Sequence, residues 1–284
     1  MNRWATMVLL PLVIAACGGT AAAPAIPTPI APTPPTSENL ILRGFVYDTA
    51  FRPVAGVTVE IIDGPHSGTS LTTNDLGTFE FSGTFVRGSL FTLRATRQGY
   101  APTTRSFTIP TGTRPEVSVG LPLNSLTAPV DVAGAYTLTL TADSACVGLP
   151  EAVRTRTYEV EIVPLSVPTS LRGGVLGASF LDGYNWFSVG VSGDYVSFIV
   201  DFDGPTIVER IAERTYLTIG GGGGVLLEMS RPSRIAIPFD GEFFYCELKP
   251  ESSVAPYAAC FRPDSTIVRS SCMSRAHRLM LTRH

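Results

Sequence analysis

The chain has 284 residues, enough for about two domains of ordinary size. Charged residues make up 16% of it and the formal net charge is −3, which excludes the strongly basic surface of a nucleic-acid-binding protein. The 27 glycines and 23 prolines divide the chain into short segments that alternate apolar and polar residues. This pattern is typical of all-β proteins.

Residues 1–16 have the features of an export signal. Arg3 gives a positive start, a mostly apolar run follows, and small residues precede Cys17. A helix needs about 20 apolar residues to cross a bilayer, so this run is too short for a permanent span. An ordinary buried helix with an incidental cysteine is the alternative.

The tetrapeptide IAAC at 14–17 resembles the lipobox of bacterial lipoproteins. The resemblance implies that residues 1–16 are a lipoprotein signal peptide and that Cys17 carries the lipid and becomes the N-terminus. Several acyl chains on one cysteine anchor a protein stably without a transmembrane helix. The expected location is the cell envelope, at the outer membrane, facing either the periplasm or the cell surface. The membrane is therefore the first predicted partner.

Residues 17–38 are predicted to form a disordered, proline-rich tether. The stretch TAAAPAIPTPIAPTPPTS at 20–37 contains six prolines and no charge. It holds too little large apolar surface to fold, and it favours extended polyproline geometry. Such a tether would hold the next domain roughly 50 Å from the lipid. A proline-motif ligand for a partner protein is the alternative.

Period-two alternation runs through residues 39–123. In GVTVEII, Val57, Val59 and Ile61 fall on one face of a strand, and GTFEF places two phenylalanines opposite threonine and glutamate. About seven short strands separated by turn residues predict a seven-stranded, Greek-key-like antiparallel sandwich.

The same region resembles a carboxypeptidase regulatory-like domain, the transthyretin-like sandwich found in many bacterial surface proteins. The resemblance implies a spacer or interaction module without peptidase activity, because neither His66 nor His277 begins a zinc-binding motif. The asparagine and aspartate of its second motif fit a turn, with a calcium site as the alternative. The residues that carry the resemblance are Pro53, Gly56, Asn74, Asp75, Gly77, Phe79, Gly99, Tyr100 and Pro102.

Residues 124–284 begin with a connector and then continue the alternation to the end of the chain. Eight to ten antiparallel strands predict a closed or nearly closed β-barrel, with a two-sheet sandwich as the alternative. The segments GAYTLTLTADSACVGLP and CMSRAHRLMLTR also resemble uncharacterised β-rich C-terminal regions of envelope lipoproteins, which implies no known activity. The inward face is expected to include Tyr136, Leu138, Leu140, Tyr158, Val160 and Ile162.

Four further cysteines in an exported chain predict two disulfides, and three connectivities are possible. If the first and last barrel strands pair, Cys146 meets Cys272, and Cys246 pairs with Cys260 across its own loop. These bonds would close loops of about 127 and 15 residues and contribute roughly 4 to 5 and 3 kcal/mol. A metal site is the alternative, although no Cys-x-x-Cys occurs.

No motif marks a catalytic or cofactor-binding centre, and neither a cofactor nor a metal is expected. The five glycines at 220–224 lack the lysine of a phosphate loop and are predicted to form a flexible hairpin. The candidate ligand site is LDGYNWFSVG at 181–190, because aromatic faces beside amide and carboxylate groups suit stacking on sugars. Core packing of these rings is the alternative. The candidate residues are Asp182, Tyr184, Asn185 and Trp186.

Together these features predict a non-catalytic, lipid-anchored envelope protein that serves as an interaction or scaffold module for an envelope protein or a glycan. One alternative binds a carbohydrate or small apolar ligand inside the C-terminal barrel, which requires an open lumen lined by small side chains. Another is a hydrolase, which requires a cleft where a serine or carboxylate meets His66 or His277.

Overall fold

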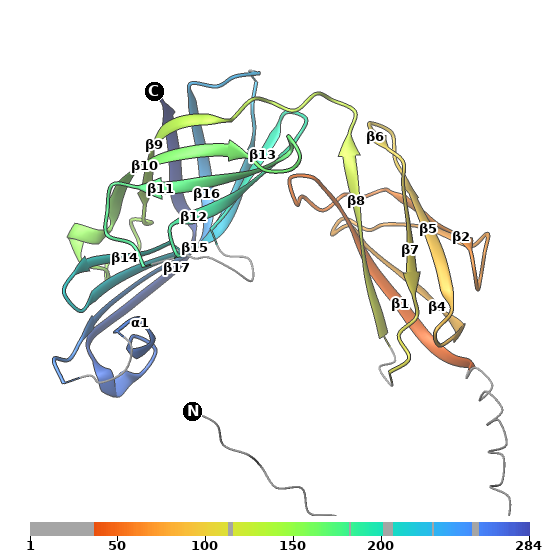
Figure 1. Ribbon diagram of the computed structural model, residues 1–284, viewed down its shortest axis with the longest axis horizontal. Helices are drawn as coiled ribbons and strands as arrows, with labels where there is room; N and C mark the ends of the chain where they lie inside the picture. Colours follow the sequence, from red (N-terminus) through yellow and green to blue (C-terminus); the bar gives the residue numbers. More distant parts are fainter. Residues whose placement is uncertain (1–36, 113–115, 182, 201–206, 229, 252–255) are drawn as a thin grey trace, which may run out of the picture. The chain divides into compact units, whose positions relative to one another are not determined.

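The protein is described by a computed structural model, shown in Figure 1. Cys17 and nearly all of the predicted tether lie outside the described residues, as does Asp182. Within the described part of the chain, no helix is long and apolar enough to cross a membrane. The described residues are 37–112, 116–181, 183–200, 207–228, 230–251 and 256–284.

Nearly all regular structure in these residues is β-strand, as the sequence predicted. The N-terminal strands are β1 (Ser37–Asp48), β2 (Thr58–Asp63), β3 (Ser70–Thr72), β4 (Thr78–Val86), β5 (Leu90–Thr96), β6 (Tyr100–Ala101), β7 (Thr103–Thr108) and β8 (Glu116–Ser125). The C-terminal strands are β9 (Gly134–Thr141), β10 (Thr155–Pro164), β11 (Ser170–Leu176), β12 (Trp186–Ser192), β13 (Tyr195–Ile199), β14 (Ile207–Ala212), β15 (Thr215–Leu226), β16 (Arg234–Leu248) and β17 (Thr266–Arg283). Short helical turns are η1 (Glu151–Val153), α1 (Pro256–Ala259) and η2 (Pro263–Ser265).

Strands β1 to β8, coloured orange to yellow-green in Figure 1, form a sandwich of two four-stranded sheets. The strand orders are β4-β1-β8-β6 and β3-β2-β5-β7. All neighbours are antiparallel except β1 and β8, which run parallel. The predicted core face is confirmed, since Val57, just before β2, and Val59 and Ile61 of β2 are buried and pack in one cluster with all three phenylalanines of β4. The structure has eight strands here where about seven were predicted, and β3 and β6, of three and two residues, are too short to show alternation in the sequence.

The turn between β3 and β4 shows why Asn74 and Gly77 stand where they do. The side-chain oxygen Oδ1 of Asn74 accepts hydrogen bonds from the backbone N–H groups of Leu76 at 3.0 Å and Thr78 at 2.9 Å. Gly77 has a φ of +69°, and a Cβ there would lie 2.6 Å from the carbonyl oxygen of Val46. The turn interpretation of this motif therefore agrees with the structure.

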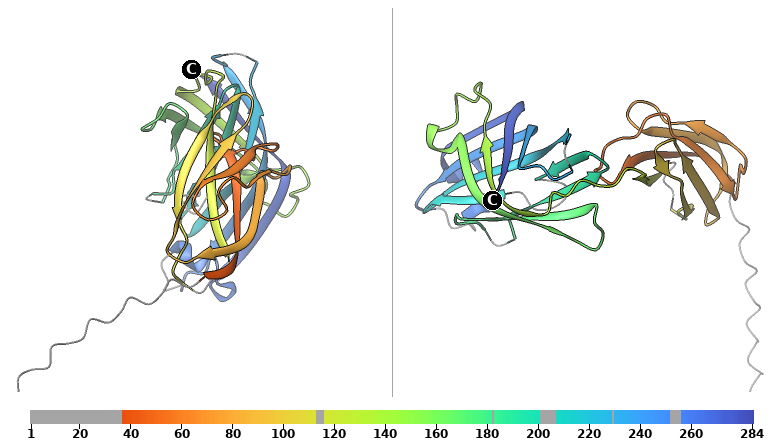
Figure 2. Two further views of the ribbon diagram at one scale, coloured as in Figure 1. Left: turned by 90° about the vertical axis from the view of Figure 1, so that its right-hand side faces the viewer. Right: turned by 90° about the horizontal axis from the view of Figure 1, so that it is seen from above.

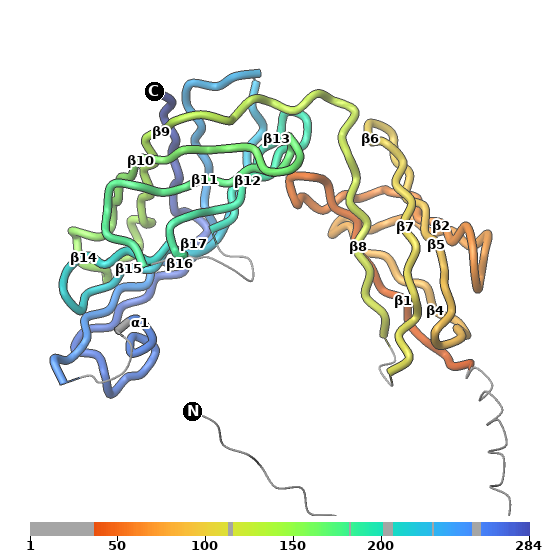
Figure 3. Tube along the Cα trace, in the orientation of Figure 1, coloured from red at the N-terminus to blue at the C-terminus, as the bar shows by residue number. Residues whose placement is uncertain are grey.

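Strands β9 to β17 form an up-and-down β-barrel, drawn from green to blue in Figure 2. The closed ring is β9-β10-β11-β12-β13-β15-β16-β17, and β14 is an extra strand on the edge of β15. The tube in Figure 3 follows this meander from each strand to its neighbour. The first and last strands complete the ring, with Leu138 opposite Leu281 and Leu140 opposite Leu279. The barrel prediction is confirmed over the two-sheet alternative.

The glycine run at 220–224 lies inside β15, so the predicted hairpin is wrong. The first half of β15 pairs with β14 and the second half with β13, and the glycines stand where the strand changes neighbours. At Gly221, φ is +133° and a Cβ would lie 2.2 Å from the carbonyl oxygen of Asp240. Glycine is needed there because β15 and β16 approach each other so closely at a corner of the barrel.

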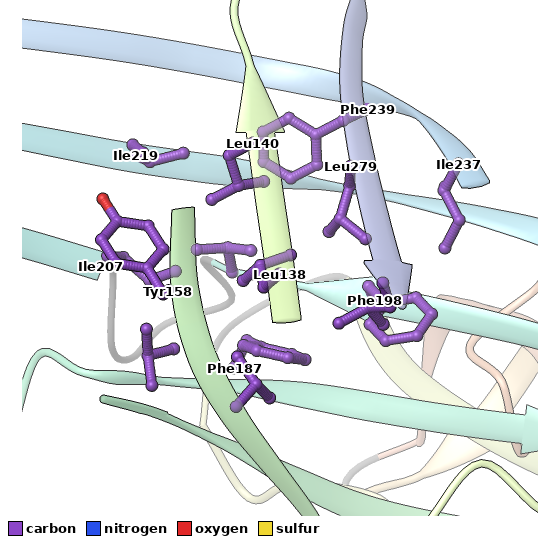
Figure 4. Packing of buried hydrophobic residues seen from close by; sticks show 14 of the residues in the cluster. Leu138, Leu140, Tyr158, Phe187, Phe198, Ile207, Ile219, Ile237, Phe239 and Leu279 are labelled. Atoms are coloured by element: carbon purple, nitrogen blue, oxygen red, sulfur yellow. The ribbon is translucent and has the colours of Figure 1, made fainter. Parts of the chain in front are cut away.

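Side chains fill the barrel lumen, as Figure 4 shows. Alternate residues of the strands point inward, and the faces predicted for β9 and β10 are confirmed. Burying one large apolar side chain contributes about 1.5–3 kcal/mol, so this packed interior is the main source of the domain's stability. The inward residues include Leu138, Leu140, Tyr158, Phe187, Phe198, Ile219, Ile237, Phe239 and Leu279.

Two disulfides join the cysteine pairs that the sequence predicted. Cys146, beyond β9, bonds to Cys272 of β17, and Cys246 of β16 bonds to Cys260, just after α1. The second bond holds α1 against the outer wall of the barrel. A small second core forms there, outside the lumen, from Val208, Tyr216, Phe244, Leu248 and Ala259 with the two cysteines.

Candidate functional site

The two histidines that a hydrolase would use are committed to structural contacts. His277 is fully buried; its Nδ1 accepts the backbone N–H of Asp143 at 2.9 Å, so its Nε2 donates to the carbonyl of Gly241 at 3.2 Å. His66 is bonded through Nε2 to the carbonyl oxygen of Thr84 at 2.9 Å. Within the described chain, neither ring has a hydrogen bond to a serine or carboxylate side chain, so neither forms the pair that the hydrolase alternative required of it.

Ser274 and Asp143 lie beside His277 and form a polar clasp. The Ser274 hydroxyl donates to Asp143 Oδ2 at 2.5 Å. This bond, together with the backbone N–H of Ala145, holds the pKa of Asp143 below its ordinary value. The clasp therefore ties the loop after β9 to β17.

Each predicted ligand residue that the structure describes makes a different contact. Trp186 opens β12 with the guanidinium of Arg172 at 4.7 Å from its ring centroid. Asn185 donates its Nδ2 to the carbonyl of Val175 at 3.4 Å. Tyr184 precedes β12 in the sequence and is 38% exposed, and its ring centroid lies 6.0 Å from that of Tyr257. Tyr257, the ring that Tyr184 contacts, lines the surface described next.

An open groove of about 540 Å³ on the outer wall of the barrel brings together aromatic, acidic and basic side chains. We call it the aromatic groove. It lies over β15, β16, β17 and α1, in the region where α1 is drawn in Figure 1. Its lining residues are Thr218, Gly220, Gly221, Asp240, Gly241, Glu242, Phe244, Tyr257, Phe261, Arg269 and Met273.

The wall of the aromatic groove is a corner of three rings. Alternation along β16 sends Phe243 and Tyr245 into the lumen and Phe244 to the outside. The ring of Phe261 stacks on that of Phe244, with centroids 5.5 Å apart and planes at 5°. Tyr257 stands nearly perpendicular to Phe261, at 84° and 5.4 Å. The Cys246–Cys260 bond brings both loop rings onto β16.

Polar groups surround these rings. The Arg269 guanidinium lies 5.4 Å from the centroid of Phe244. Asp240 Oδ2 is 3.4 Å from Nε of Arg275, and the Glu242 carboxylate accepts a hydrogen bond from Ser271. The floor is backbone without side chains, because glycines stand at 220, 221 and 241. A bound molecule would therefore meet aromatic faces, acceptors and donors at once.

Two other concave surfaces carry less varied chemistry. A trough of about 700 Å³ lies on the outer wall between β9 and β16 and carries Arg234, Arg275 and Arg278. A pocket of about 230 Å³ on the sandwich is apolar and includes Phe45 and Leu76. Of these three concave surfaces, the aromatic groove is the one that combines rings with two carboxylates and a guanidinium.

Sequence reasoning missed the groove residues Phe244, Tyr257, Phe261 and Arg269, and its candidate Tyr184 contacts the groove only through the ring of Tyr257. One signal was present: three successive aromatic residues at 243–245 must place at least one ring outside the barrel. The predicted Cys246–Cys260 bond also places the loop that holds the other two rings beside that strand. Reading these two signals together would have indicated the groove wall.

Comparison with known proteins gives little guidance for the whole chain. No curated protein sequence matches it. Catechol 1,2-dioxygenase from Acinetobacter sp. ADP1, inhibited by bound mercury, is similar over 34% of this chain and 55% of its own, with 13% identity and a TM-score of 0.26. The Bacillus anthracis TIE protein is similar over 83% and 48%, with 10% identity and a TM-score of 0.27. A protein of unknown function from Bacteroides ovatus is similar over 79% and 68%, with 12% identity and a TM-score of 0.23.

The chain spans about half the length of the first two of these structures, and TM-scores this low carry no functional argument. The family comparison is more specific. The profile of the carboxypeptidase regulatory-like domain matches residues 41–122, which run from within β1 to within β8. The sandwich of this protein is therefore a carboxypeptidase regulatory-like domain, as its motifs predicted.

Proposed function

We propose that this is a non-catalytic, lipid-anchored protein of the cell envelope that binds a partner through the outer wall of its C-terminal barrel. One contrast carries the proposal. The lumen is filled by buried side chains such as Phe187, Phe198 and Phe239, whereas the wall presents an open groove in which the ring of Phe261 is exposed. A barrel that held a ligand inside would need interior space, so the packed lumen argues against that alternative.

The N-terminal part of the chain supports the same function. A carboxypeptidase regulatory-like domain is a non-catalytic module, and here it stands between the predicted tether and the barrel. The sandwich would act as a spacer, and Cys17 would fix the chain to the membrane. The groove would then face a partner in the envelope.

Replacing Cys17 by serine tests the anchor. We expect the wild-type protein, expressed in a bacterial host, to take up an alkyne fatty acid and to sediment with membranes. The Cys17→Ser variant should take up no label and should leave the membrane fraction, because its other four cysteines are disulfide-bonded. A double Cys246→Ser/Cys260→Ser variant is the control and should be labelled normally. Absence of label on the wild-type protein would contradict the anchor.

Co-sedimentation with envelope fragments tests the interaction. We expect the purified lipidated protein, in detergent micelles, to sediment with isolated envelope fragments. Phe261→Glu should lower the retained fraction at least fivefold, because a charge would stand against the groove rings. Leu165→Glu is a matched control, since Leu165 is 53% exposed and Phe261 54%. Failure of the wild type to sediment would contradict the function, and equal retention of all three proteins would contradict the groove's part in it.

A further inference from the structure

We infer that the aromatic groove is a binding site for a neutral saccharide. The inference rests on the proposed function, because it names the chemistry of the partner that the barrel wall would bind. It differs from the sequence prediction in its residues, which come from β16, the Cys246–Cys260 loop and β17.

The rings are arranged to present a face. Phe261 stacks on Phe244 through one side and is nevertheless 54% exposed, so part of its surface is open to a ligand. Tyr257 stands at 84° to it and closes one side of the corner. The face of an aromatic ring carries partial negative charge, which attracts the polarised C–H groups of a sugar ring laid flat against it. A flat, semi-polar ring fits this corner better than a bulky aliphatic group.

The polar rim fits hydroxyl groups. Every sugar hydroxyl is both a donor and an acceptor, so a site for several of them needs partners of both kinds. Asp240 and Glu242 supply acceptors, and Arg269 supplies donors on the same groove. The Thr218 hydroxyl, which donates to the Tyr257 hydroxyl at 3.1 Å, adds a polar group beside the rings. A wholly apolar ligand would displace water from these polar groups without replacing its hydrogen bonds, at a cost in binding free energy.

The charges indicate a neutral ligand. Two carboxylates, Asp240 and Glu242, are matched by two guanidinium groups, Arg269 in the groove and Arg275 in its ion pair with Asp240. A positively charged ligand would be attracted by the two carboxylates and repelled by the two guanidinium groups, and the reverse holds for a negatively charged ligand. The groove volume of about 540 Å³ is in the range of small-molecule sites, ~300–1,000 Å³. The glycine floor adds no side chain that would prevent close approach.

Titration of the full-length protein in detergent micelles tests the inference, with cellotriose, maltotriose, the trimer of N-acetylglucosamine and the anionic trigalacturonate as probes. Calorimetry should detect binding of at least one neutral trisaccharide and at least tenfold weaker binding of trigalacturonate. Phe261→Ala should lower the affinity for the neutral trisaccharide at least tenfold. Phe45→Ala is the matched control, because Phe45 is 47% exposed on the sandwich, and it should leave the affinity unchanged.

A second variant separates ligand contact from folding. Glu242→Gln keeps an acceptor oxygen and the side-chain shape, so it should leave the unfolding midpoint unchanged. Because it replaces the second acceptor oxygen by an NH₂ group, it should lower the affinity for the saccharide at least threefold. No binding of any neutral trisaccharide, binding unaffected by Phe261→Ala, or equal binding of trigalacturonate would overturn the inference. If the wild type still sedimented with envelope fragments in a groove-dependent way, the proposed function would stand while the saccharide was rejected. Loss of both saccharide binding and groove-dependent sedimentation would reject the saccharide site and the proposed function together.

Discussion

Replacing Cys146 and Cys272 by serine will lower the free energy of unfolding of the barrel by about 4–5 kcal/mol. The two cysteines are 126 residues apart, so the bond restricts the unfolded chain strongly. It also joins the end of β9 to β17, the two strands that complete the ring. Trp186 lies in β12 and the other tryptophan, Trp4, lies in the predicted signal peptide, so tryptophan fluorescence during urea denaturation follows the barrel.

The second disulfide provides the comparison. Cys246 and Cys260 are 14 residues apart, and the loop-closure model gives their bond about 3 kcal/mol. Their serine variant should therefore lose less stability than the first variant. It should also release the rings of Tyr257 and Phe261 from β16. A larger loss from this pair than from Cys146 and Cys272 would contradict the assignment of the longer-range bond as the stronger constraint.

Replacing Glu209 by alanine will cost about 3–5 kcal/mol in unfolding free energy. Glu209 of β14 is almost fully buried and accepts hydrogen bonds from both Nε and Nη2 of Arg156 and, at 2.8 Å, from the hydroxyl of Tyr158. Burial, reinforced by this carboxylate, raises the pKa of Tyr158. Without Glu209, a guanidinium and a buried phenol lose their acceptor. The loss should fall near the lower end of the range, because Arg156 is 26% exposed.

Two further variants isolate this effect from the loss of a carboxylate in general. Glu161→Ala removes an exposed carboxylate from β10, and its effect should stay within about 0.5 kcal/mol. A Glu209→Met/Arg156→Met double variant should recover much of the lost stability, because no uncompensated charge remains. A Glu209→Ala variant as stable as Glu161→Ala would show that the buried cluster contributes nothing. The measurement is again urea denaturation followed by Trp186 fluorescence.

Alternation predicted the inward faces of the barrel well because one face of each strand packs in the lumen and the other meets solvent. Leu138 and Leu140 of β9 illustrate this, as do Tyr158 and Val160 of β10. The Cys146–Cys272 pairing followed from the same reasoning, since it needed only the pairing of the first strand with the last. These features depend on local periodicity and one topological assumption.

The groove could not be predicted as a whole because its residues come from segments far apart in the sequence. Thr218, Phe244 and Arg269 meet only through the register of β15, β16 and β17. The hairpin predicted at the glycine run was wrong for a related reason. Its composition resembles that of a loop. Its position inside β15, where the neighbouring strand changes from β14 to β13, depends on pairings that the local sequence does not show. Trp186 begins β12, whereas Tyr184 precedes that strand and packs on Tyr257.

The order of the strands also determines when the barrel can form. The ring closes through β9 and β17, and β17 is the last element of the chain, Thr266–Arg283. A chain that ends before it leaves one edge of β9 and one edge of β16 without a partner, and it lacks Cys272. Such a truncated product would display unpaired strand edges and a free thiol at Cys146, features that proteases and chaperones recognise. The ring is thus complete only once β17 has paired with both β9 and β16.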